Sequence, residues 1–518
     1  MTDSPFSLLP FLAEAVLLGD KRLDRRFLSM AESCLPSATS SLAGMFGKDP
    51  GNVKGAQRFL SNDSVELSQL REVLYACSLE NLRRHQAKSV LCVFDPTLLD
   101  YSAQHWKQER MPIGDRDGLG YEWLNALLIE ASGGRILGVV HQALHSLGGK
   151  DDDLDYLRDA RKKKRRSKAF LEKQERNFKN TFLHIAEAAD KRVPADVELI
   201  HVADRDFDDG LVLRSRRAAG SNRHFVIRGN ANRIVQLRTP EWLPAECVLG
   251  RGQKNLDSNP EHLVDVHVKD VVEHVPCRFK RTLHLDNRGR VCREEVASQH
   301  ASLEIGATPI RLGRASKRGE LLGIEEEPVW LNLVVVREAE DSGRKTKTPI
   351  QWLLLTDLPI DTLEAIDRVV QLYRRRWRTE EFFRSEKDAL QAERSELDDE
   401  RATARLLVFT TLKAMFLDEL RFRAEVPAGE KLPKELRREL RAAGNRAREL
   451  EMDRRKGTPI PRLTTKERGL MALGVIAYEG SWTGVSLGNY VLLRGLPVFI
   501  HDVSEGRYAW PVSDEDVG

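Results

Sequence analysis

The most informative stretch of the sequence runs from Tyr373 to Lys387 and reads YRRRWRTEEFFRSEK. On a helix with about 100° of rotation per residue, four of its side chains fall within roughly 60° of one another: Tyr373, Arg376, Glu380 and Lys387. Ion pairs between residues three or four apart would explain the charges of an exposed helix, but not this grouping of residue types. The pattern favours an anion-binding face that also carries one metal ligand.

Two aspartates each follow an apolar run that is typical of a buried strand. Ser89–Phe94 leads to Asp95, and Val197–Ala203 leads to Asp204. We expect both side chains where these strands end, at the edge of the sheet that holds ligand sites in α/β folds. A turn or cap role is the alternative for a lone aspartate. With Glu380 the two aspartates would form an all-oxygen site, which prefers Mg²⁺ or Mn²⁺ to Zn²⁺ and suits two-ion phosphoryl transfer.

The order of the predicted elements indicates a mixed α/β sheet with helices on its faces. Two more strands, Leu124–Glu130 and Ile136–His141, follow Ser89–Phe94, and a helical stretch at about 170–190 precedes Val197–Ala203. Residues from about 231 to 355 alternate apolar and polar side chains and are rich in β-branched residues, as in a β-rich insertion.

Composition places the chain among soluble globular proteins. It has 518 residues, 41% apolar and 31% charged, with a net charge of +3 from 82 basic and 79 acidic side chains. Local clusters of basic residues carry more positive charge than this net value suggests. Those at Arg158–Lys168 and Lys431–Lys456 are either solvated surface or nucleic-acid contacts. The same alternatives hold for the N-terminal arginines, which are Arg22, Arg25, Arg26 and Arg58.

Several function classes lack support. Six scattered cysteines without a CxxC pair argue against a zinc ribbon or a disulfide scaffold and fit a reducing compartment. The apolar run Phe6–Leu18 is interrupted by Glu14 and is too short to span a bilayer. We therefore expect a cytoplasmic protein with no membrane contact. No phosphate-binding loop or dinucleotide fingerprint supports the use of ATP or NAD.

The spacing of Tyr373, Arg376, Glu380 and Lys387 resembles the Y-R-E-K signature of the insertion sequence four family of DDE transposases. The surrounding segments RWRTEEFF, IDRVVQLY and QWLLLTDLP also resemble the family, as do VFDPT and VADRDFD around the two aspartates. Near the N-terminus, LGDKRLDRR and GAQRFLSND are similar to the family's DNA-end-binding domain. The resemblance extends from about residue 15 to 415.

This resemblance implies an RNase H-like catalytic core in which Asp95, Asp204 and Glu380 are the catalytic metal ligands. It implies Mg²⁺ as cofactor, with Mn²⁺ as a substitute. The corresponding domains are a helical DNA-end-binding domain (1–80), a first part of the core (81–230), a β-rich insertion (231–355), the Glu-bearing helices of the core (356–425), and a basic helical C-terminal region that is a candidate for dimerisation (426–518).

The resemblance also implies a cut-and-paste reaction on double-stranded DNA. A strand is nicked at the transposon end, its 3′-OH forms a hairpin with the opposite strand, and after reopening it attacks target DNA. The protein would act as a homodimer in a synaptic complex, in the bacterial cytoplasm at the nucleoid. Trp352 matches the tryptophan that stacks on a flipped base, with a core tryptophan as the alternative. The implied contacts to phosphate or nearby DNA are Tyr373, Arg376, Lys387, Arg205 and Arg228.

The sequence is also compatible with two other functions. A metal-dependent nuclease without strand transfer would share the three acids, but gives no reason for Trp352 and the Tyr-Arg-Lys stripe. A domesticated DNA-binding protein or transposition inhibitor has no use for three mutually repelling carboxylates.

Overall fold

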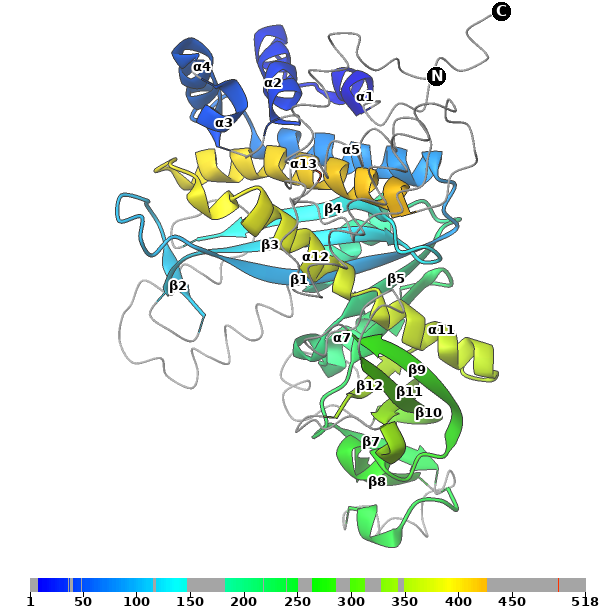
Figure 1. The fold of residues 1–518 in the computed structure, drawn as a ribbon. Coiled ribbons are helices and arrows are strands. Elements are labelled where there is room, and N and C mark those ends of the chain that lie inside the picture. The colour runs from blue at the N-terminus through cyan, green and yellow to red at the C-terminus, as the bar shows by residue number, and fades with distance from the viewer. Residues whose placement is uncertain are drawn as a thin grey trace, which may run out of the picture. The chain divides into compact units, whose positions relative to one another are not determined.

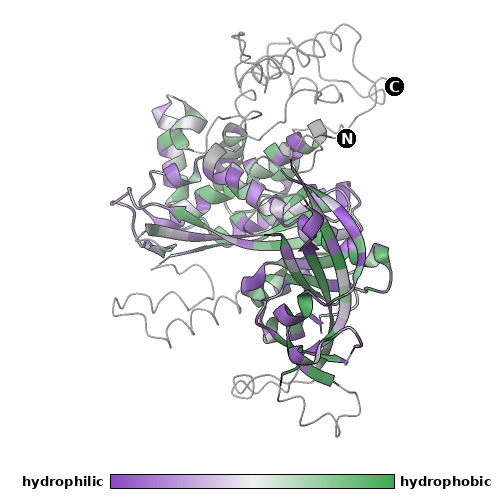
Figure 2. Cartoon of the chain, turned by 60° about the horizontal axis from the view of Figure 1, so that its bottom comes forward, coloured by the Kyte–Doolittle hydropathy of each residue, from purple (hydrophilic) through white to green (hydrophobic). Residues whose placement is uncertain are grey.

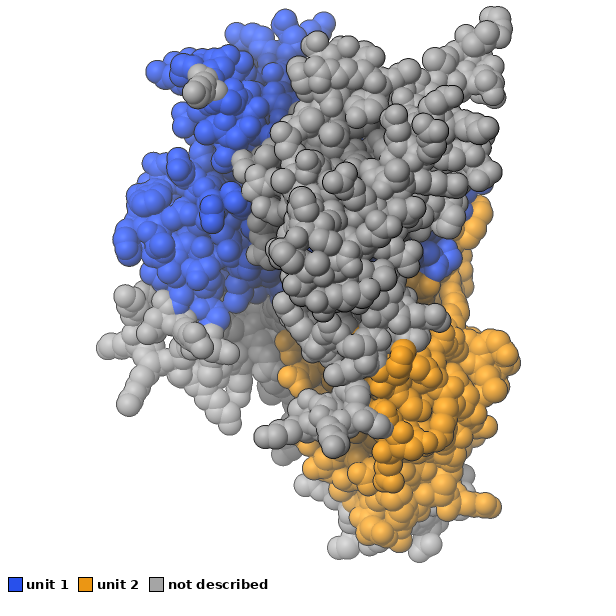
Figure 3. All heavy atoms as spheres, viewed as in Figure 1, with its two compact units in different colours: residues 1–87, 96–174, 378–518 blue, residues 88–95, 175–377 orange. Residues whose placement is uncertain are grey.

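The computed structural model describes residues 8–35, 37, 41–47, 49–114, 118–146, 182–217, 219–238, 240–249, 263–285, 299–312, 328–342, 349–425 and 492. The basic runs Arg158–Lys168 and Lys431–Lys456 lie outside these residues, as does nearly all of the predicted C-terminal region. The chain divides into two compact units (Figure 3): unit 1 is Met1–Ala87, Pro96–Gln174 and Arg378–Gly518, and unit 2 is Lys88–Asp95 and Glu175–Trp377.

Unit 1 begins with five helices, which confirm the predicted helical N-terminal region. They are α1 (Leu8–Ala15), α2 (Lys21–Cys34), α3 (Leu42–Phe46), α4 (Pro50–Leu60) and α5 (Leu67–Arg84). Asp20 and Asp49 fix the starts of α2 and α4, because each carboxylate accepts backbone N–H groups of the first helical turn. The buried face of α2 is apolar and includes Phe27 and Met30.

The sheet of unit 1 is antiparallel and is covered by two helices. Its strands are β2 (Met111–Ile113), β3 (Gly118–Glu130), β4 (Ile136–His145) and the last part of β1 (Ser89–Asp100). Helices α5 and α13 (Glu400–Glu425) pack on β4 and on each other (Figure 1). Gly138 permits this contact, because a Cβ there would lie 2.1 Å from Ser78 Oγ, and the same hydroxyl accepts the Val139 N–H at 2.8 Å.

The stretch from Tyr373 to Lys387 is not the single helix that the sequence predicted. Helix α11 (Leu363–Arg374) ends before Arg375 and Arg376, α12 (Trp377–Arg384) begins after them, and Ser385–Ala389 forms a π-helix. The Arg376 N–H donates to Tyr373 O at 3.0 Å, a tight three-residue turn that interrupts the α-helical ladder. The helical positions calculated from the sequence at 100° per residue therefore do not apply across this stretch.

The sheet of unit 2 has the strand order β1-β5-β6-β12-β11-β10-β7-β8, and β9 pairs with β10. The strands are β5 (Glu198–Ala203), β6 (Arg223–Arg228), β7 (Ile234–Arg238), β8 (Leu263–His267), β9 (Cys277–Leu285), β10 (Gln299–Leu312), β11 (Val329–Glu338) and β12 (Gln351–Thr356). Strands β1, β5 and β6 are parallel, and the other pairs are antiparallel. Unit 2 also contains α7 (Gly210–Arg217), α9 (Val268–Val272), α11 and a helical segment at 182–192.

These elements confirm a mixed α/β protein. Many residues along the strands are hydrophobic, as in a sheet with buried faces (Figure 2). One expectation about β1 is wrong. The strand does not end at Asp95 but continues to Asp100. Pairing to β5 stops at Val93, while pairing to β3 goes on, and the Tyr101 N–H still donates to Leu119 O at 3.0 Å.

Candidate active site

The parallel pairing of β1 and β5 ends just before the two predicted aspartates. The last paired residues are Val93 and Val202, so Asp95 and Asp204 each follow this last pair by two residues. Neighbouring strands lie about 4.8 Å apart, and residues in register point to the same face of a sheet. The two predicted aspartates therefore lie at the same end of two neighbouring parallel strands, Asp95 within its strand and Asp204 directly after its own.

Arg228 extends this row on the other side of Asp204. Ala203 pairs with Ile227, so Asp204 is in register with Arg228 at the end of β6. Arg228 in turn pairs with Leu354 of β12, and its guanidinium donates to Gln351 O at 3.1 Å. Asp95 and Arg228 thus lie on β1 and β6, and Asp204 directly follows β5, the strand between them.

Arg376 joins the row from the turn after α11. Its Nη1 lies 2.9 Å from Asp95 Oδ2, and both side chains are largely shielded from solvent, at 13% and 23% exposed. Burial raises the pKa of the Tyr373 hydroxyl, whereas the nearby Arg376 and Arg228 act to lower it. The two cations therefore face the same phenol as well as the acidic pair.

Trp352 lies against Tyr373, with their ring centroids 5.6 Å apart. Both rings are buried, at 8% and 3% exposed, so Trp352 has the core packing that the sequence left as an alternative. A base could reach its ring only if one of the two side chains moved. The residues of unit 2 that come together are Asp95, Asp204, Arg228, Trp352, Tyr373 and Arg376.

Asp204 also begins a short helical turn. Its Oδ1 accepts the Asp206 N–H at 2.9 Å and caps the 3₁₀ turn Arg205–Phe207, which confirms the cap role that the sequence held open. Arg205 is exposed on this turn. Phe207 packs below it against Phe94, with a centroid distance of 5.1 Å, and so ties the turn to the strand that carries Asp95.

Glu380 belongs to unit 1, on α12, and Arg378 holds this helix in place. Its guanidinium forms a bidentate pair with the buried Asp418 of α13, at 2.8 and 2.9 Å, and donates to Gly134 O at 3.1 Å. On the buried face of α12, Phe383 packs on Trp123 at 6.5 Å between ring centroids. The sequence reasoning gave no role to Arg378 or Asp418. The pairing of Arg378 with Asp418 depends on the burial of α13, and no local sequence pattern predicts that burial.

Lys387 lies on the π-helix and points to the end of β1 within unit 1. Its Nζ donates to Leu98 O at 2.7 Å and pairs with Glu393 at 3.1 Å. Its neighbour Glu386 points the other way and is fully buried, where it accepts hydrogen bonds from Thr411 and Asn125. Burial raises the pKa of Glu386 well above its ordinary value.

The N-terminal arginines lie on α2 and α4 of unit 1. Arg22, Arg25 and Arg58 are exposed, although Arg22 is paired with Asp20 at 2.7 Å. Arg26 packs across Gly55 of α4, where a Cβ would come within 2.6 Å of its guanidinium. Three of the four arginines are therefore exposed on this helix pair.

The oxygen-rich row has the donor chemistry that Mg²⁺ prefers. Within the residues described, no three His, Cys, Asp or Glu side chains gather closely enough to form a metal cluster by themselves. Asp95 and Asp204 would each offer one carboxylate, and an ion at Asp95 would have to displace the guanidinium of Arg376. The donor chemistry of these two carboxylates therefore suits a divalent ion.

The N-terminal helices match a known family. Residues 12–65 match the family model described as "Transposase DNA-binding", a range that includes α2, α3 and α4. Unit 1 thus carries a transposase-type DNA-binding domain, and its exposed arginines lie in the matched segment.

Among solved structures, the chain is similar to the piggyBac transposase in a cryo-EM synaptic complex with hairpin DNA. The TM-score is 0.32 and the sequence identity 11%, over 81% of this chain and 67% of that chain. At this level of similarity nothing about function follows from it. None of the described helices is both long and apolar enough to cross a membrane.

Proposed function

We propose that the protein is a cut-and-paste DNA transposase of the insertion sequence four type, with an RNase H-like core and Asp95, Asp204 and Glu380 as its catalytic metal ligands. The observation that carries the proposal is the parallel pairing of β1 and β5, which ends two residues before both Asp95 and Asp204, together with the 2.9 Å contact between Arg376 and Asp95. The transposase-type DNA-binding segment at 12–65 supports DNA as the substrate.

The strand pattern supports the RNase H-like part of the proposal. Strands β5 and β6 run parallel to β1, while β3 and β4 form an antiparallel hairpin next to the last part of β1. In such a core Mg²⁺ would activate the attacking oxygen and stabilise the leaving one. Glu380 is the third ligand in the proposal, and within unit 1 its helix is held by the contacts of Arg378.

The other residues of the row would hold DNA. A phosphate of the cut strand would lie between Arg376, Arg228 and the Tyr373 hydroxyl, because guanidinium groups bind phosphate through paired N–H donors. Lys387 and Arg205 would contact the neighbouring backbone. Trp352 would turn from Tyr373 to stack on a base that leaves the helix when the hairpin forms, at a cost of a few kcal/mol. In the synaptic complex two copies would each bind one end.

A gel assay tests the proposal. The protein is incubated with Mg²⁺ and the end DNA of its own element, and the products are separated on denaturing gels. Hairpins and joined products support a transposase, nicks alone support a nuclease, and shifted but uncut DNA supports a DNA-binding protein. Glu380→Gln should abolish cutting and leave end binding intact, while the exposed Glu364→Gln on α11 serves as the control. Equal loss of cutting and binding in Glu380→Gln would contradict its assigned role.

A further inference from the structure

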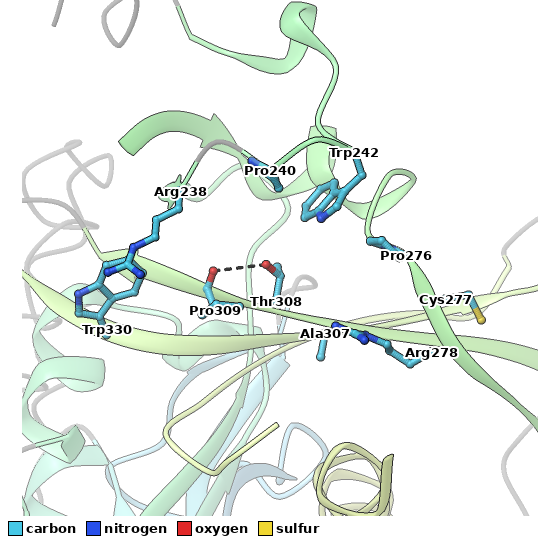
Figure 4. Close-up of a pocket in the computed structure, with 10 residues that line it drawn as sticks. All are labelled: Arg238, Pro240, Trp242, Pro276, Cys277, Arg278, Ala307, Thr308, Pro309 and Trp330. Atoms are coloured by element: carbon cyan, nitrogen blue, oxygen red, sulfur yellow. Dashed lines mark hydrogen bonds between the residues drawn. The ribbon is translucent and has the colours of Figure 1, made fainter. Parts of the chain in front are cut away.

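Unit 2 contains a pocket of about 480 Å³ away from the acidic row (Figure 4). Its walls come from β7, β9, β10, β11 and the segments beside them, whereas the acidic row lies on β1, β5 and β6. The side chains that give the pocket its chemistry are Arg238, Trp242, Pro276, Arg278, Pro309 and Trp330. This volume falls in the range of about 300–1,000 Å³ found for small-ligand sites.

Two indole rings provide flat apolar surfaces in this pocket. Trp330 is 36% exposed, which is unusual for so large an apolar side chain, and the Arg238 guanidinium lies 5.0 Å from its ring centroid. Figure 4 shows Trp330 and Arg238 together on one side of the pocket and Trp242 on the other. The cation–π contact holds the arginine against the ring and leaves its N–H donors available.

A β-bulge brings a second arginine to the pocket. Ile305 of β10 pairs with Phe279 of β9, but the next residue, Gly306, pairs with Cys277, so that Arg278 is the extra residue of the bulge. Bulges re-aim side chains and are frequent beside functional sites. A Cβ at Gly306 would lie 2.5 Å from Pro276 O, so glycine is what allows the bulged strand to approach so closely.

The charge of the pocket is one-sided. Its lining contains Arg238 and Arg278 and no carboxylate, and among the described residues neither guanidinium forms an ion pair. Two guanidinium groups with no carboxylate in the lining favour an anionic group in the ligand. Two indole rings favour a flat ring in the ligand. A nucleotide carries both groups, and stacking of bases on aromatic rings above a basic surface is the usual way in which proteins hold single strands.

We infer that this pocket binds an unpaired nucleotide of a DNA strand, with its base on Trp330 or Trp242 and its phosphate at Arg238 and Arg278. The site adds a strand-holding contact to the protein and does not depend on the acidic row. Paired bases do not offer a free face for such stacking, so the pocket discriminates against duplex DNA.

Cys277 gives a local readout of pocket occupancy, because it lines the pocket and is exposed. The full chain is treated with iodoacetamide in EDTA, which suppresses cutting, and alkylation of the Cys277 peptide is followed by mass spectrometry. An oligo-dT strand of about ten nucleotides should slow alkylation several-fold, whereas a blunt duplex at the same nucleotide concentration should not.

Trp330→Ala should raise the strand concentration needed for protection by about 5- to 100-fold, the range expected for loss of one stacked base. Arg278→Ala should make the salt dependence of strand binding shallower by about 0.7 in log–log slope. Trp106→Ala, which removes an exposed tryptophan of unit 1, is the matched control. If Trp330→Ala does not fold, Trp330→Phe keeps an aromatic face and should retain most of the protection.

Three results would overturn the inference: no protection by the strand, equal protection in Trp330→Ala, or equal protection by the duplex at the same nucleotide concentration. A protein that fails to cut end DNA in the gel assay could still pass this test. Failure of the proposed function and failure of the pocket are therefore distinguishable.

Discussion

The two units of the chain hold carboxylates in opposite environments. In unit 2, Asp95 is 23% exposed and lies 2.9 Å from the Arg376 guanidinium. In unit 1, Glu386 is fully buried among neutral partners, the Thr411 hydroxyl and the Asn125 amide. A nearby cation keeps a carboxylate ionised, whereas burial favours the neutral acid. Only the first environment suits a metal ligand, and the second suits a structural hydrogen bond.

The largest expected effect separates these two kinds of acid. Asp95→Asn and Asp204→Asn should each lower end cleavage by about 10³-fold or more, because loss of a ligand to a catalytic ion removes several kcal/mol of transition-state stabilisation. Gel assays under single-turnover conditions measure the loss. The exposed Asp196→Asn in unit 2 should cleave normally. Near-normal cleavage by either variant would remove the acidic row from the mechanism.

A smaller effect is expected at Trp352. Trp352→Ala should leave nicking nearly intact and lower hairpin formation by about 10- to 100-fold, since base extrusion costs a few kcal/mol. The two products are resolved on one denaturing gel. Trp352→Phe, which retains packing against Tyr373, should be intermediate. Parallel loss of nicking and hairpins would mean that Trp352 acts only in the core.

Arg376 should compete with a divalent ion for Asp95. Arg376→Ala removes this competing positive charge, so half-saturation by Mn²⁺ should occur at a several-fold lower concentration. Isothermal titration calorimetry measures the shift, with Arg374→Ala at the end of α11, where the guanidinium donates to Gln371, as the control. An unchanged or weaker Mn²⁺ affinity would show that the ion does not bind at Asp95.

The smallest effect concerns stability at Glu386. Because burial raises the pKa of Glu386 in the folded state, its contribution to stability is complete below the ordinary value of 4.5 and is lost as the pH rises. Glu386→Gln removes this loss and should raise the melting temperature at pH 8 more than at pH 5.5. Each kcal/mol added to the free energy of unfolding raises the melting temperature of a large domain by about 2–4 °C.

The exposed Glu396→Gln is the control for this comparison, and calorimetric scans at the two pH values provide the measurement. A melting temperature that falls equally at both pH values would mean that the Glu386 carboxyl is needed for its hydrogen bonds and carries no ionisation penalty.

Local patterns predicted the strands that carry the acidic pair, because apolar runs bounded by turn residues are a short-range signal. They missed the continuation of β1 through Pro96, which depends on pairing with the distant β3. They also missed the break between α11 and α12, since the residues 375 and 376 have ordinary helix propensities.

The site shows the same division between local and long-range information. Spacing within one segment singled out Tyr373 and Arg376, and both lie at the acidic row. The Arg378–Asp418 pair and the bulge at Arg278 arise from contacts between segments far apart in the chain. No local pattern encodes such contacts.

The central claim, that Asp95, Asp204 and Glu380 hold one divalent-ion site, has a direct test. Fe²⁺ is bound in place of Mg²⁺, ascorbate and peroxide are added, and the backbone cuts made by the locally generated radicals are mapped by mass spectrometry. Cuts are expected beside all three acids, suppressed by excess Mg²⁺ and absent in Asp95→Asn. Cuts confined to other segments, or cuts near Asp95 and Asp204 without one near Glu380, would contradict it.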